Sequence, residues 1–225
     1  MIMKVIAVIP AYNEEQVIGG VVEKARRFVH EVVVVDDGSG DKTGASAGAA
    51  GARVYTHVVN RGLGATLATG IAAALSRGAD VVVTLDADGQ HDPAEIPRFV
   101  EAIQARDVDA VIGSRLLGRK DSMPLHRRLY NWVGNLVTYL LFGLWVTDSQ
   151  SGYRAFSRHG AEQLELRCNR MEVSSEFIKE IHDKRIPFCE IPCSVTYTEY
   201  SMAKGQNLFV GISTAFKLVL RRLMK

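Results

Sequence analysis

The stretch VVVTLDADGQHDP, residues 81–93, decides the fold class of this 225-residue chain, because a strand-forming run ends in three aspartates. Residues 81–85 are apolar or β-branched, as in a strand that is buried on both faces of a parallel sheet. Asp86, Asp88 and Asp92 follow at the carboxyl end of that strand. Open α/β sheets bind ligands at this edge, and crowded carboxylates repel one another unless a proton or a cation intervenes. The stretch therefore predicts an α/β fold with a metal site at the edge of the sheet.

Strand and helix patterns alternate on both sides of this stretch. Further strands are predicted at residues 4–9, 32–35, 52–58, 109–112, 151–156 and 186–197. Helices are predicted over residues 14–29, from 42, over 64–77, from 93 and over 174–184. Asn13 and Gln16 have the spacing of a capping box for the first helix, and Asp92 before Pro93 is typical of a helix start. The alternation as far as residue 112 predicts parallel strands with right-handed crossovers, and the whole chain is expected to form a mostly parallel sheet flanked by helices.

The composition is that of an ordinary globular protein, with 47% hydrophobic and 23% charged residues. A net charge of +2 does not mark the whole molecule as a nucleic-acid binder, so we expect no nucleic-acid partner. Cys168, Cys189 and Cys193 are expected to be reduced thiols. A zinc site at Cys189 and Cys193 is disfavoured, because no second pair of ligands accompanies them.

The longest apolar run, residues 136–146, is shorter than the ~20 residues that a membrane-spanning helix needs. The first ten residues are predicted to form a strand rather than a signal peptide. We therefore expect a chain without a transmembrane span, which leaves open that it lies on a membrane surface.

Asp86, Asp88 and Gln90 place oxygen ligands at alternate positions, which suits Mg²⁺ or Mn²⁺. A calcium loop of the EF-hand type is excluded, because it needs glycine at the sixth position and glutamate at the twelfth. Counted from Asp86, this sequence has its glycine at the fourth position and Pro97 at the twelfth. A solvated acidic turn is the alternative, and it explains Asp92 but not the first two aspartates.

Two further loops carry weaker indications of a nucleotide-binding site. The stretch NRGLGATLATG, residues 60–70, lacks the third glycine of a dinucleotide fingerprint and follows the wrong strand. Its amides can approach a phosphate at a helix start, or it can be a tight turn, and the sequence does not separate these interpretations. In DDGSGDKTG, residues 36–44, Asp36 and Asp37 end the second strand, where carboxylates accept hydrogen bonds from a base or ribose. Aspartate and glycine are also common in turns.

Six stretches in this order resemble the family 2 glycosyltransferases with a GT-A fold, and the resemblance covers nearly the whole chain. They are VIPAYNEE (8–15), VVVVDDGSGDKT (32–43), NRGLGATLATG (60–70), LDADGQHDP (85–93), VIGSR (111–115) and DSQSGYRAF (148–156). The last two narrow the likeness to the dolichyl- or polyprenyl-phosphate sugar synthases.

The resemblance implies roles for individual residues. The nucleotide-sugar pocket would contain Pro10, Tyr12, Glu14, Val35, Asp37, Asp86, Ala87, Asp88 and Gln90. The metal ligands would be Asp86, Asp88 and Gln90. The acceptor phosphate would meet Ser114, Arg115, Arg127 and Arg128, and Asp86, Asp88 and Arg115 would be the catalytic residues. A metal neutralises charge on a leaving diphosphate, and guanidinium groups hold an anion in line for attack.

Two departures from the family pattern affect these expectations. Many relatives have an arginine and a Gly-x-Ser-Lys stretch near the end of the catalytic domain, whereas this chain has TYTEYSMAKGQN, residues 196–207. Lys204 is the cation of that stretch and is therefore the candidate for contacting the donor's phosphates. Many relatives also continue into transmembrane helices. We expect either a peripheral enzyme on the cytoplasmic face of a membrane or a piece of a longer chain.

The expected organisation is a single GT-A catalytic domain over residues 1–225. Its parts are a nucleotide-sugar-binding half (1–115), interface helices (116–147), an acceptor half (148–206) and an amphipathic C-terminal helix (207–225). The aromatic and basic residues of 126–146 suit a bilayer surface, and a helix buried in the core is the competing interpretation. The cations of the C-terminal helix suit the same surface, and a packed terminal helix with a solvated face is its alternative.

By resemblance, the expected function is an inverting, metal-dependent transfer of a hexose to dolichyl or polyprenyl phosphate. Mannose from GDP-mannose is the first candidate, and glucose or N-acetylglucosamine from a uridine nucleotide is the second. A sugar-phosphate nucleotidyltransferase is the first non-transferase alternative, although PAYNEE (10–15) is not the Gly-rich, arginine-containing loop that such an enzyme has after its first strand. A non-catalytic membrane-binding module is the second.

Overall fold

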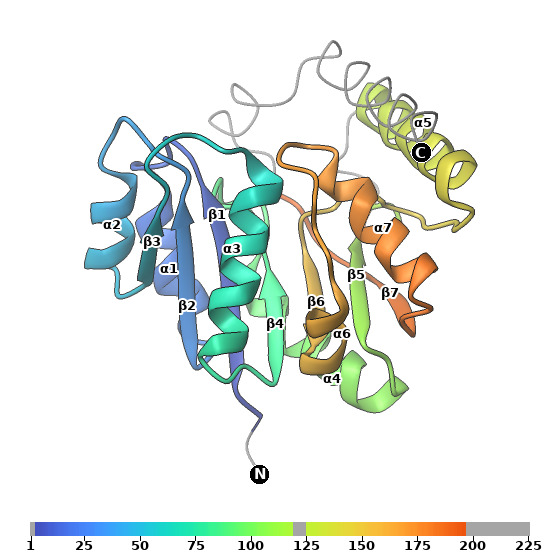
Figure 1. The fold of residues 1–225 in the computed structure, drawn as a ribbon, viewed down its shortest axis with the longest axis horizontal. Helices are drawn as coiled ribbons and strands as arrows, with labels where there is room; N and C mark the ends of the chain where they lie inside the picture. The colour runs from blue at the N-terminus through green and yellow to red at the C-terminus, as the bar shows by residue number, and fades with distance from the viewer. Residues whose placement is uncertain (1–2, 119–124, 197–225) are drawn as a thin grey trace.

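A seven-stranded sheet forms the centre of the structure, with the strand order β3-β2-β1-β4-β6-β5-β7 (Figure 1). The computed structural model describes residues 3–118 and 125–196, with only the backbone of residues 125–130. The strands are β1 (Val5–Ala11), β2 (Glu31–Asp36), β3 (Arg53–Thr56), β4 (Val81–Thr84), β5 (Ala110–Ser114), β6 (Arg154–Ser157) and β7 (Phe188–Pro192). The helices are α1 (Ile18–Ala25), α2 (Thr43–Ala49), α3 (Leu63–Ser76), α4 (Ile96–Arg106), α5 (Leu125–Phe142), α6 (Arg158–Gln163) and α7 (Val173–Asp183).

Helices cover both faces of the sheet, because successive side chains of its strands point to opposite sides. In β1, Val5, Ala7 and Ile9 pack with residues of α1, α2 and α4. Ile6 and Val8 pack on the opposite face with residues of α3 and α7. Figure 1 shows α3, α6 and α7 in front of the sheet. The predicted α/β class with a helix-flanked sheet is therefore confirmed.

The sheet is mostly parallel, as predicted, while β6 runs antiparallel to both β4 and β5. The chain leaves β5 at the carboxyl edge of the sheet, and α5 lies beyond that edge (Figure 1). The segment after α5 re-enters the sheet from the same side, so β6 runs in the opposite direction. Its first residue, Arg154, therefore lies at the same edge as the last residues of β4 and β5.

The start of the first helix also differs from the prediction. The structure begins α1 at Ile18, and no side chain caps its first turn, so the predicted capping box at Asn13 is wrong. Asn13 has a positive φ of 54° and its Oδ1 accepts a hydrogen bond from Gly40 N at 2.9 Å. Its side chain thus holds the loop after β2 instead of a helix end. Asp92, in contrast, caps the turn Pro93–Glu95 before α4 as predicted, accepting from Ala94 N at 3.0 Å.

Helix α5 buries two polar residues and exposes several large apolar ones. Asn135 and Thr138 are buried, with 3% and 1% of their surface exposed. On the outer side, large apolar residues are 42–72% exposed: Trp132, Val133, Tyr139 and Leu140, which we call the apolar face of α5. The interpretation of this segment as a helix buried in the core is therefore wrong. No helix of the described residues has the length and hydropathy needed to cross a membrane.

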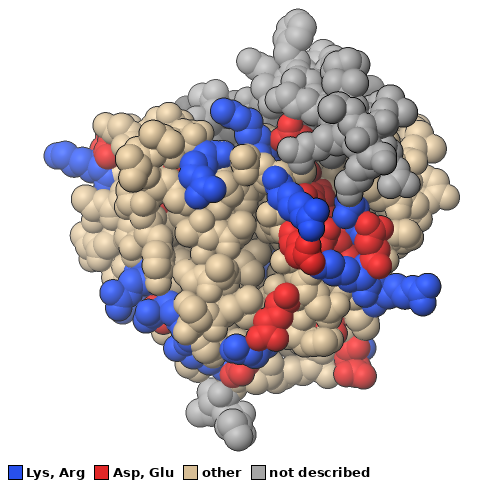
Figure 2. All heavy atoms as spheres, viewed as in Figure 1, with Lys and Arg blue, Asp and Glu red and all other residues tan. Residues whose placement is uncertain are grey.

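Charges of both signs are mixed on the side of the molecule that carries α7 (Figure 2). Lys184 pairs with Glu165 at 2.9 Å and with Glu180 at 3.2 Å, and Lys179 pairs with Asp183 at 3.0 Å. Ion pairs at a protein surface contribute about 0–1 kcal/mol each. The pair of Lys184 with Glu165 connects the end of α7 to the segment after α6. The three cysteines are free, as predicted.

Candidate active site

The candidate site lies where the carboxyl ends of β1, β4 and β5 meet the first residue of β6. Val8 of β1 pairs with Thr84 of β4, so Pro10 and Asp86 both stand two residues beyond this pair. The strand order reverses at this point, since β1 lies between β2 and β4. Open α/β sheets bind ligands in the crevice at such a switch point.

Asp86 stands two residues after the end of β4, and 42% of its side chain is open to solvent. Its carboxylate lies directly against Gly152, where a Cβ atom would come within 2.3 Å of Asp86 Oδ1. On its other side, His91 Nδ1 accepts from Asp86 N at 3.3 Å and lies 3.6 Å from Asp86 Oδ2. Residue 152 must therefore lack a side chain for Asp86 to keep this position.

Asp88 is held by the residue predicted to be its fellow ligand. Its two oxygens accept from Gln90 N at 2.9 Å and from Gln90 Nε2 at 2.5 Å. Burial, followed by the charge of Asp86, raises the pKa of Asp88, although the hydrogen bonds from Gln90 oppose this. The two carboxylates thus repel each other, which is the condition that a cation relieves.

The donor set fits a divalent cation whose coordination the substrate completes. Among the described residues, no group of three or more His, Cys, Asp or Glu side chains is arranged to hold a metal. Mg²⁺ is usually bound by one or two carboxylates together with substrate phosphates and water. Asp86 and Asp88 meet that requirement, whereas a closed site built from protein ligands alone would need more.

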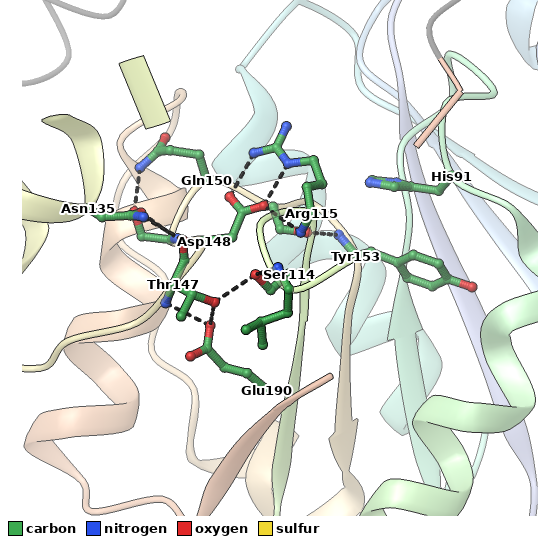
Figure 3. Close-up of polar contacts among 12 residues, drawn as sticks. His91, Ser114, Arg115, Asn135, Thr147, Asp148, Gln150, Tyr153 and Glu190 are labelled. Carbon is green, nitrogen blue, oxygen red and sulfur yellow. Dashed lines mark hydrogen bonds and ion pairs between the residues drawn. The ribbon is translucent and has the colours of Figure 1, made fainter. Parts of the chain in front are cut away.

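Arg115, at the end of β5, is paired with a residue that sequence reasoning did not single out. Asp148 Oδ2 accepts from Arg115 N at 3.0 Å and from Nε at 2.7 Å, and Asp148 Oδ1 accepts from Nη2 at 2.8 Å (Figure 3). Asp148 is fully buried, and 18% of the Arg115 side chain is exposed. The pair fixes both the backbone and the guanidinium of Arg115 at the edge that carries the two aspartates.

The loop around Asp148 is fixed by a polar network that the sequence did not reveal (Figure 3). Asn135 Nδ2 donates to Thr147 O at 2.5 Å, and Asn135 Oδ1 accepts from Ser149 N at 2.9 Å. Thr147 N donates to Glu190 Oε1 at 2.8 Å. The only signal in the sequence is that Asp148 and Ser149 open the stretch DSQSGYRAF, which spacing alone does not connect to residues on β5, β7 or α5.

Ser114, predicted to meet the acceptor phosphate, is buried within this network. Its hydroxyl oxygen lies 2.6 Å from Thr147 Oγ1 and accepts from Leu117 N at 3.3 Å. Its side chain therefore supports the loop that carries Asp148, and its contact with an acceptor stays a prediction.

Arg154 places a buried positive charge near Asp86 and Asp148. It is 1% exposed, its Nη2 donates to Ser149 O at 3.1 Å, and its guanidinium lies 4.6 Å from the centre of the Phe177 ring. Burial lowers its pKa to about 10, which Asp86 and Asp148 oppose, so it remains charged at neutral pH. Its Nε has no hydrogen-bond partner among the described residues.

The residues predicted to contact the nucleotide lie in different environments. Tyr12 is 48% exposed, Glu14 is 9% exposed, and Val35 is wholly buried in the core. Asp37 is 3% exposed and accepts from Arg61 N at 2.9 Å, from Gly62 N at 2.7 Å and from His57 Nδ1 at 2.7 Å. The carboxylate of Asp37 therefore holds the loop between β3 and α3, and its contact with a nucleotide stays a prediction.

The Gly-rich turn before α3 serves packing in this structure. Gly64 N and Ala65 N both donate to Asn169 O, at 2.8 and 3.3 Å. A Cβ atom at Gly64 would lie 1.8 Å from Cys168 O. The amides of Gly64 and Ala65 thus already donate within the chain, which favours the tight turn over a phosphate site.

Several predicted site residues lie outside what the structure describes. Lys204 and the helix predicted over residues 207–225 are outside the described residues. Arg127 and Arg128 lie at the start of α5, where the description covers the backbone alone.

Comparison with known proteins agrees with this geometry. The model of the glycosyl transferase family 2 matches residues 6–164. A UDP-N-acetylglucosamine–dolichyl-phosphate N-acetylglucosaminyltransferase of Methanococcus voltae is 35% identical, with 97% of this chain and 96% of that protein covered. An undecaprenyl-phosphate mannosyltransferase of Micrococcus luteus is 38% identical, with 93% of this chain and 90% of that protein covered.

A solved structure supports the fold. Glucosyl-3-phosphoglycerate synthase from Mycobacterium tuberculosis, in complex with Mn²⁺, UDP-glucose and phosphoglyceric acid, superimposes with a TM-score of 0.76. The superposition covers 98% of this chain and 79% of that chain at 22% sequence identity. The expected GT-A fold is thereby confirmed.

Proposed function

We propose a reaction and substrates for this chain from the premise that it belongs to glycosyl transferase family 2. The chain is a glycosyltransferase, so the nucleotidyltransferase and the non-catalytic membrane module are no longer needed as explanations. The proposed reaction moves a hexose from a nucleotide sugar to a polyprenyl phosphate. The observation that carries it is that two repelling carboxylates after β4 and a fixed arginine after β5 share one edge of the sheet.

The acceptor would be a phosphate monoester, which is ionised at neutral pH and needs no general base. One of its oxygens would attack the anomeric carbon from the side opposite the diphosphate. The new carbon–oxygen bond forms as the bond to the diphosphate oxygen breaks, and the electron pair leaves with the diphosphate. This single displacement inverts the anomeric carbon and gives a β-linked product.

The residues of this chain would supply binding and orientation. Asp86 and Asp88, with Gln90 beside them, would hold Mg²⁺ or Mn²⁺, which neutralises the charge that develops on the leaving diphosphate. Arg115 would hold the acceptor phosphate in line with the anomeric carbon, because a guanidinium binds a phosphate through paired hydrogen bonds. Ser114, Arg127 and Arg128 are the further candidates for the acceptor phosphate, and Lys204 for the donor's phosphates.

The donor is proposed at the level of a nucleotide-activated hexose, with GDP-mannose as the first candidate. The name of the Micrococcus luteus relative as a mannosyltransferase supports this choice. The Methanococcus voltae relative is named for UDP-N-acetylglucosamine, which supports a uridine nucleotide as the second candidate. Pro10, Tyr12, Glu14, Val35 and Asp37, at the ends of β1 and β2, are the proposed contacts of the nucleotide.

The acceptor's lipid chain would bring the enzyme to a membrane surface as a peripheral protein. The apolar face of α5 supports this proposal, because Trp132 and Tyr139 are aromatic and Leu140 is 72% exposed. Trp145, just beyond α5, is 45% exposed and its ring packs edge-on against Tyr139 at 5.7 Å. Aromatic residues with apolar neighbours are typical of helices that lie in the headgroup region.

Thermal unfolding with nucleotides would test the donor. The purified protein is heated with GDP, UDP, GDP-mannose, UDP-glucose or UDP-N-acetylglucosamine, each with and without Mn²⁺. A ligand at a hundred times its dissociation constant adds about 2.7 kcal/mol to the free energy of unfolding, which is a readily measured shift. The expected result is stabilisation by nucleotides of one base, only with metal. Absence of any shift would contradict the proposal, and transfer of labelled sugar to a polyprenyl phosphate would then be the deciding assay.

A further inference from the structure

We propose that Asn135 is a positioning residue that couples the lipid-facing helix α5 to Arg115, the proposed contact of the acceptor phosphate. This inference rests on the proposed function, because it assigns Asn135 to the acceptor half of that reaction. Neither Asn135 nor its partner loop belongs to the predicted site.

The first step is that Asn135 holds the backbone on both sides of Asp148. Its Nδ2 donates to Thr147 O at 2.5 Å, and its Oδ1 accepts from Ser149 N and from Ser149 Oγ, both at 2.9 Å. Asp148 stands between these two anchored residues. A single amide side chain therefore fixes the peptide groups that determine where the carboxylate of Asp148 points.

The second step is that Asp148 determines the position of Arg115. Asp148 accepts three N–H groups of Arg115, one from the backbone and two from the guanidinium, at 2.7–3.0 Å. Asp148 has no exposed surface, so it acts on a substrate only through Arg115. A shift of the loop 147–149 would thus be passed to the guanidinium.

The third step is the location of Asn135 on the helix. Asn135 and Thr138 form the buried polar side of α5, while the apolar face of α5 (Trp132, Val133, Tyr139 and Leu140) points outward. Figure 3 shows Asn135 and Asp148 side by side, with Arg115 beyond them. A contact between the apolar face and lipid would therefore hold the same helix whose Asn135 holds the loop of Asp148.

Thr138 offers a matched control, because it lies one turn from Asn135 on the same side of α5. It is 1% exposed, and its hydroxyl lies 2.9 Å from Ser175 Oγ and 3.4 Å from Ser149 Oγ. Substitution of Thr138 by valine removes polar packing beneath α5 but leaves the bonds to Thr147 O and Ser149 N intact. It therefore reports a general loosening of the helix.

The experiment compares Asn135→Ala and Thr138→Val with the unchanged chain in a sugar-transfer assay on vesicles that contain a polyprenyl phosphate. We expect Asn135→Ala to lower kcat/KM for the acceptor at least tenfold, while KM for the nucleotide sugar and binding to lipid vesicles stay within twofold. Thr138→Val should keep kcat/KM for the acceptor within threefold. If Asn135→Ala does not fold, Asn135→Ser carries the same test, because a hydroxyl cannot reach both Thr147 O and Ser149 N.

Three results would overturn the inference. Equal losses for the two variants would mean that Asn135 only packs the helix, and loss of vesicle binding by Asn135→Ala would mean that α5 has detached. An unchanged kcat/KM for the acceptor would show that Arg115 does not depend on Asn135. If the unchanged chain transfers no sugar to any polyprenyl phosphate, the proposed function itself fails, and the inference fails with it.

Discussion

Asp148 accepts three hydrogen bonds from Arg115, and the pair joins the end of β5 to a loop 33 residues further along the chain. Asp148 is fully buried, and removing its charge takes away the carboxylate that three N–H groups of Arg115 donate to, where only 18% of the Arg115 side chain is exposed. A buried charge that loses its partner costs far more than a broken pair on the surface. The pair is therefore expected to matter for stability as well as for the acceptor.

Replacement of Asp148 by asparagine should lower the free energy of unfolding by roughly 3 kcal/mol. Urea denaturation of the variant and the unchanged chain measures this difference. Glu162→Gln is the matched control, because the Glu162–Arg158 pair is about half exposed at both residues and should contribute less than ~1 kcal/mol. Equal effects of the two substitutions would contradict the role given to Asp148.

Replacement of Asp88 by asparagine should stabilise the metal-free protein while abolishing activity. Burial and the charge of Asp86 raise the pKa of Asp88 above its value in the unfolded chain. The folded state then holds the proton more tightly, so the free energy of unfolding falls as pH rises from the ordinary aspartate pKa through the raised one. The variant should lose this fall and melt higher at pH 7 in EDTA, by about 2–4 °C for each kcal/mol relieved.

Metal should reverse that order. With Mn²⁺ and a nucleotide, the unchanged chain is expected to gain stability and Asp88→Asn to gain none. Melting curves at pH 5 and pH 7, in EDTA and in Mn²⁺ with UDP or GDP, provide the comparison. If the variant melts below the unchanged chain in EDTA, the carboxylate of Asp88 stabilises the metal-free fold, which contradicts this prediction.

The residues after β4 could be predicted from the sequence because they are local: a buried strand determines its own end, and Asp86 and Asp88 follow it directly. Arg115, directly after β5, was assigned by the family resemblance instead. Asn13 was mistaken for a helix cap, because its real partner, Gly40, is 27 residues away and no local spacing reveals it. Asp148 and Asn135 were missed for the same reason.

The direction of β6 could not be predicted, because periodicity predicts a strand without its direction. Buried strands have similar patterns in parallel and antiparallel pairs, and only the course of α5 outside the sheet decides from which edge the chain returns. The sequence also did not reveal which side of α5 faces the interior of the protein. A stretch with Trp132, Leu140 and Trp145 suits a core or a lipid surface, and only the exposure of these side chains in the folded structure speaks against the core.

Substitution of Gly152 by alanine should displace Asp86 without unfolding the chain. The new Cβ would lie 2.3 Å from Asp86 Oδ1, and that side chain can move because 42% of it is exposed. We expect stabilisation by nucleotide and Mn²⁺ to disappear, with little change in the melting temperature of the metal-free protein. Gly20→Ala is the control, since no atom lies within 4 Å of its Cβ position, and it should stabilise α1 by ~0.5–1 kcal/mol. Retained metal-dependent binding in Gly152→Ala would argue against Asp86 as a ligand.

Substitution of Asp37 by alanine separates its two possible roles. Asp37 accepts from His57 and from the amides of Arg61 and Gly62, so its loss leaves buried donors unsatisfied at a cost of about 1–3 kcal/mol. If the carboxylate mainly holds this loop, the metal-free protein should melt lower. If it mainly contacts the nucleotide, the melting temperature should hold and only nucleotide affinity should fall. Melting curves and nucleotide titrations on one preparation distinguish these outcomes, and we expect the first.

Substitution of Leu140 by serine tests the apolar face of α5. Leu140 is 72% exposed, so the change should leave the free energy of unfolding within about 0.5 kcal/mol. Burial of a leucine side chain in an apolar phase contributes about 1.5–3 kcal/mol. Since 1.4 kcal/mol corresponds to a factor of ten, binding to lipid vesicles should weaken about tenfold if this side chain enters the bilayer.

Val58→Ser is the control for that measurement. Val58 is 98% exposed and stands in the loop after β3, away from α5, so its loss removes a comparable apolar side chain from a different surface. Co-sedimentation with vesicles should separate the two variants while their melting curves coincide. Equal vesicle binding by Leu140→Ser and the unchanged chain would mean that α5 does not carry the contact with lipid. The coupling of α5 to Arg115 through Asn135 would then act without the membrane, as a fixed support of the acceptor site.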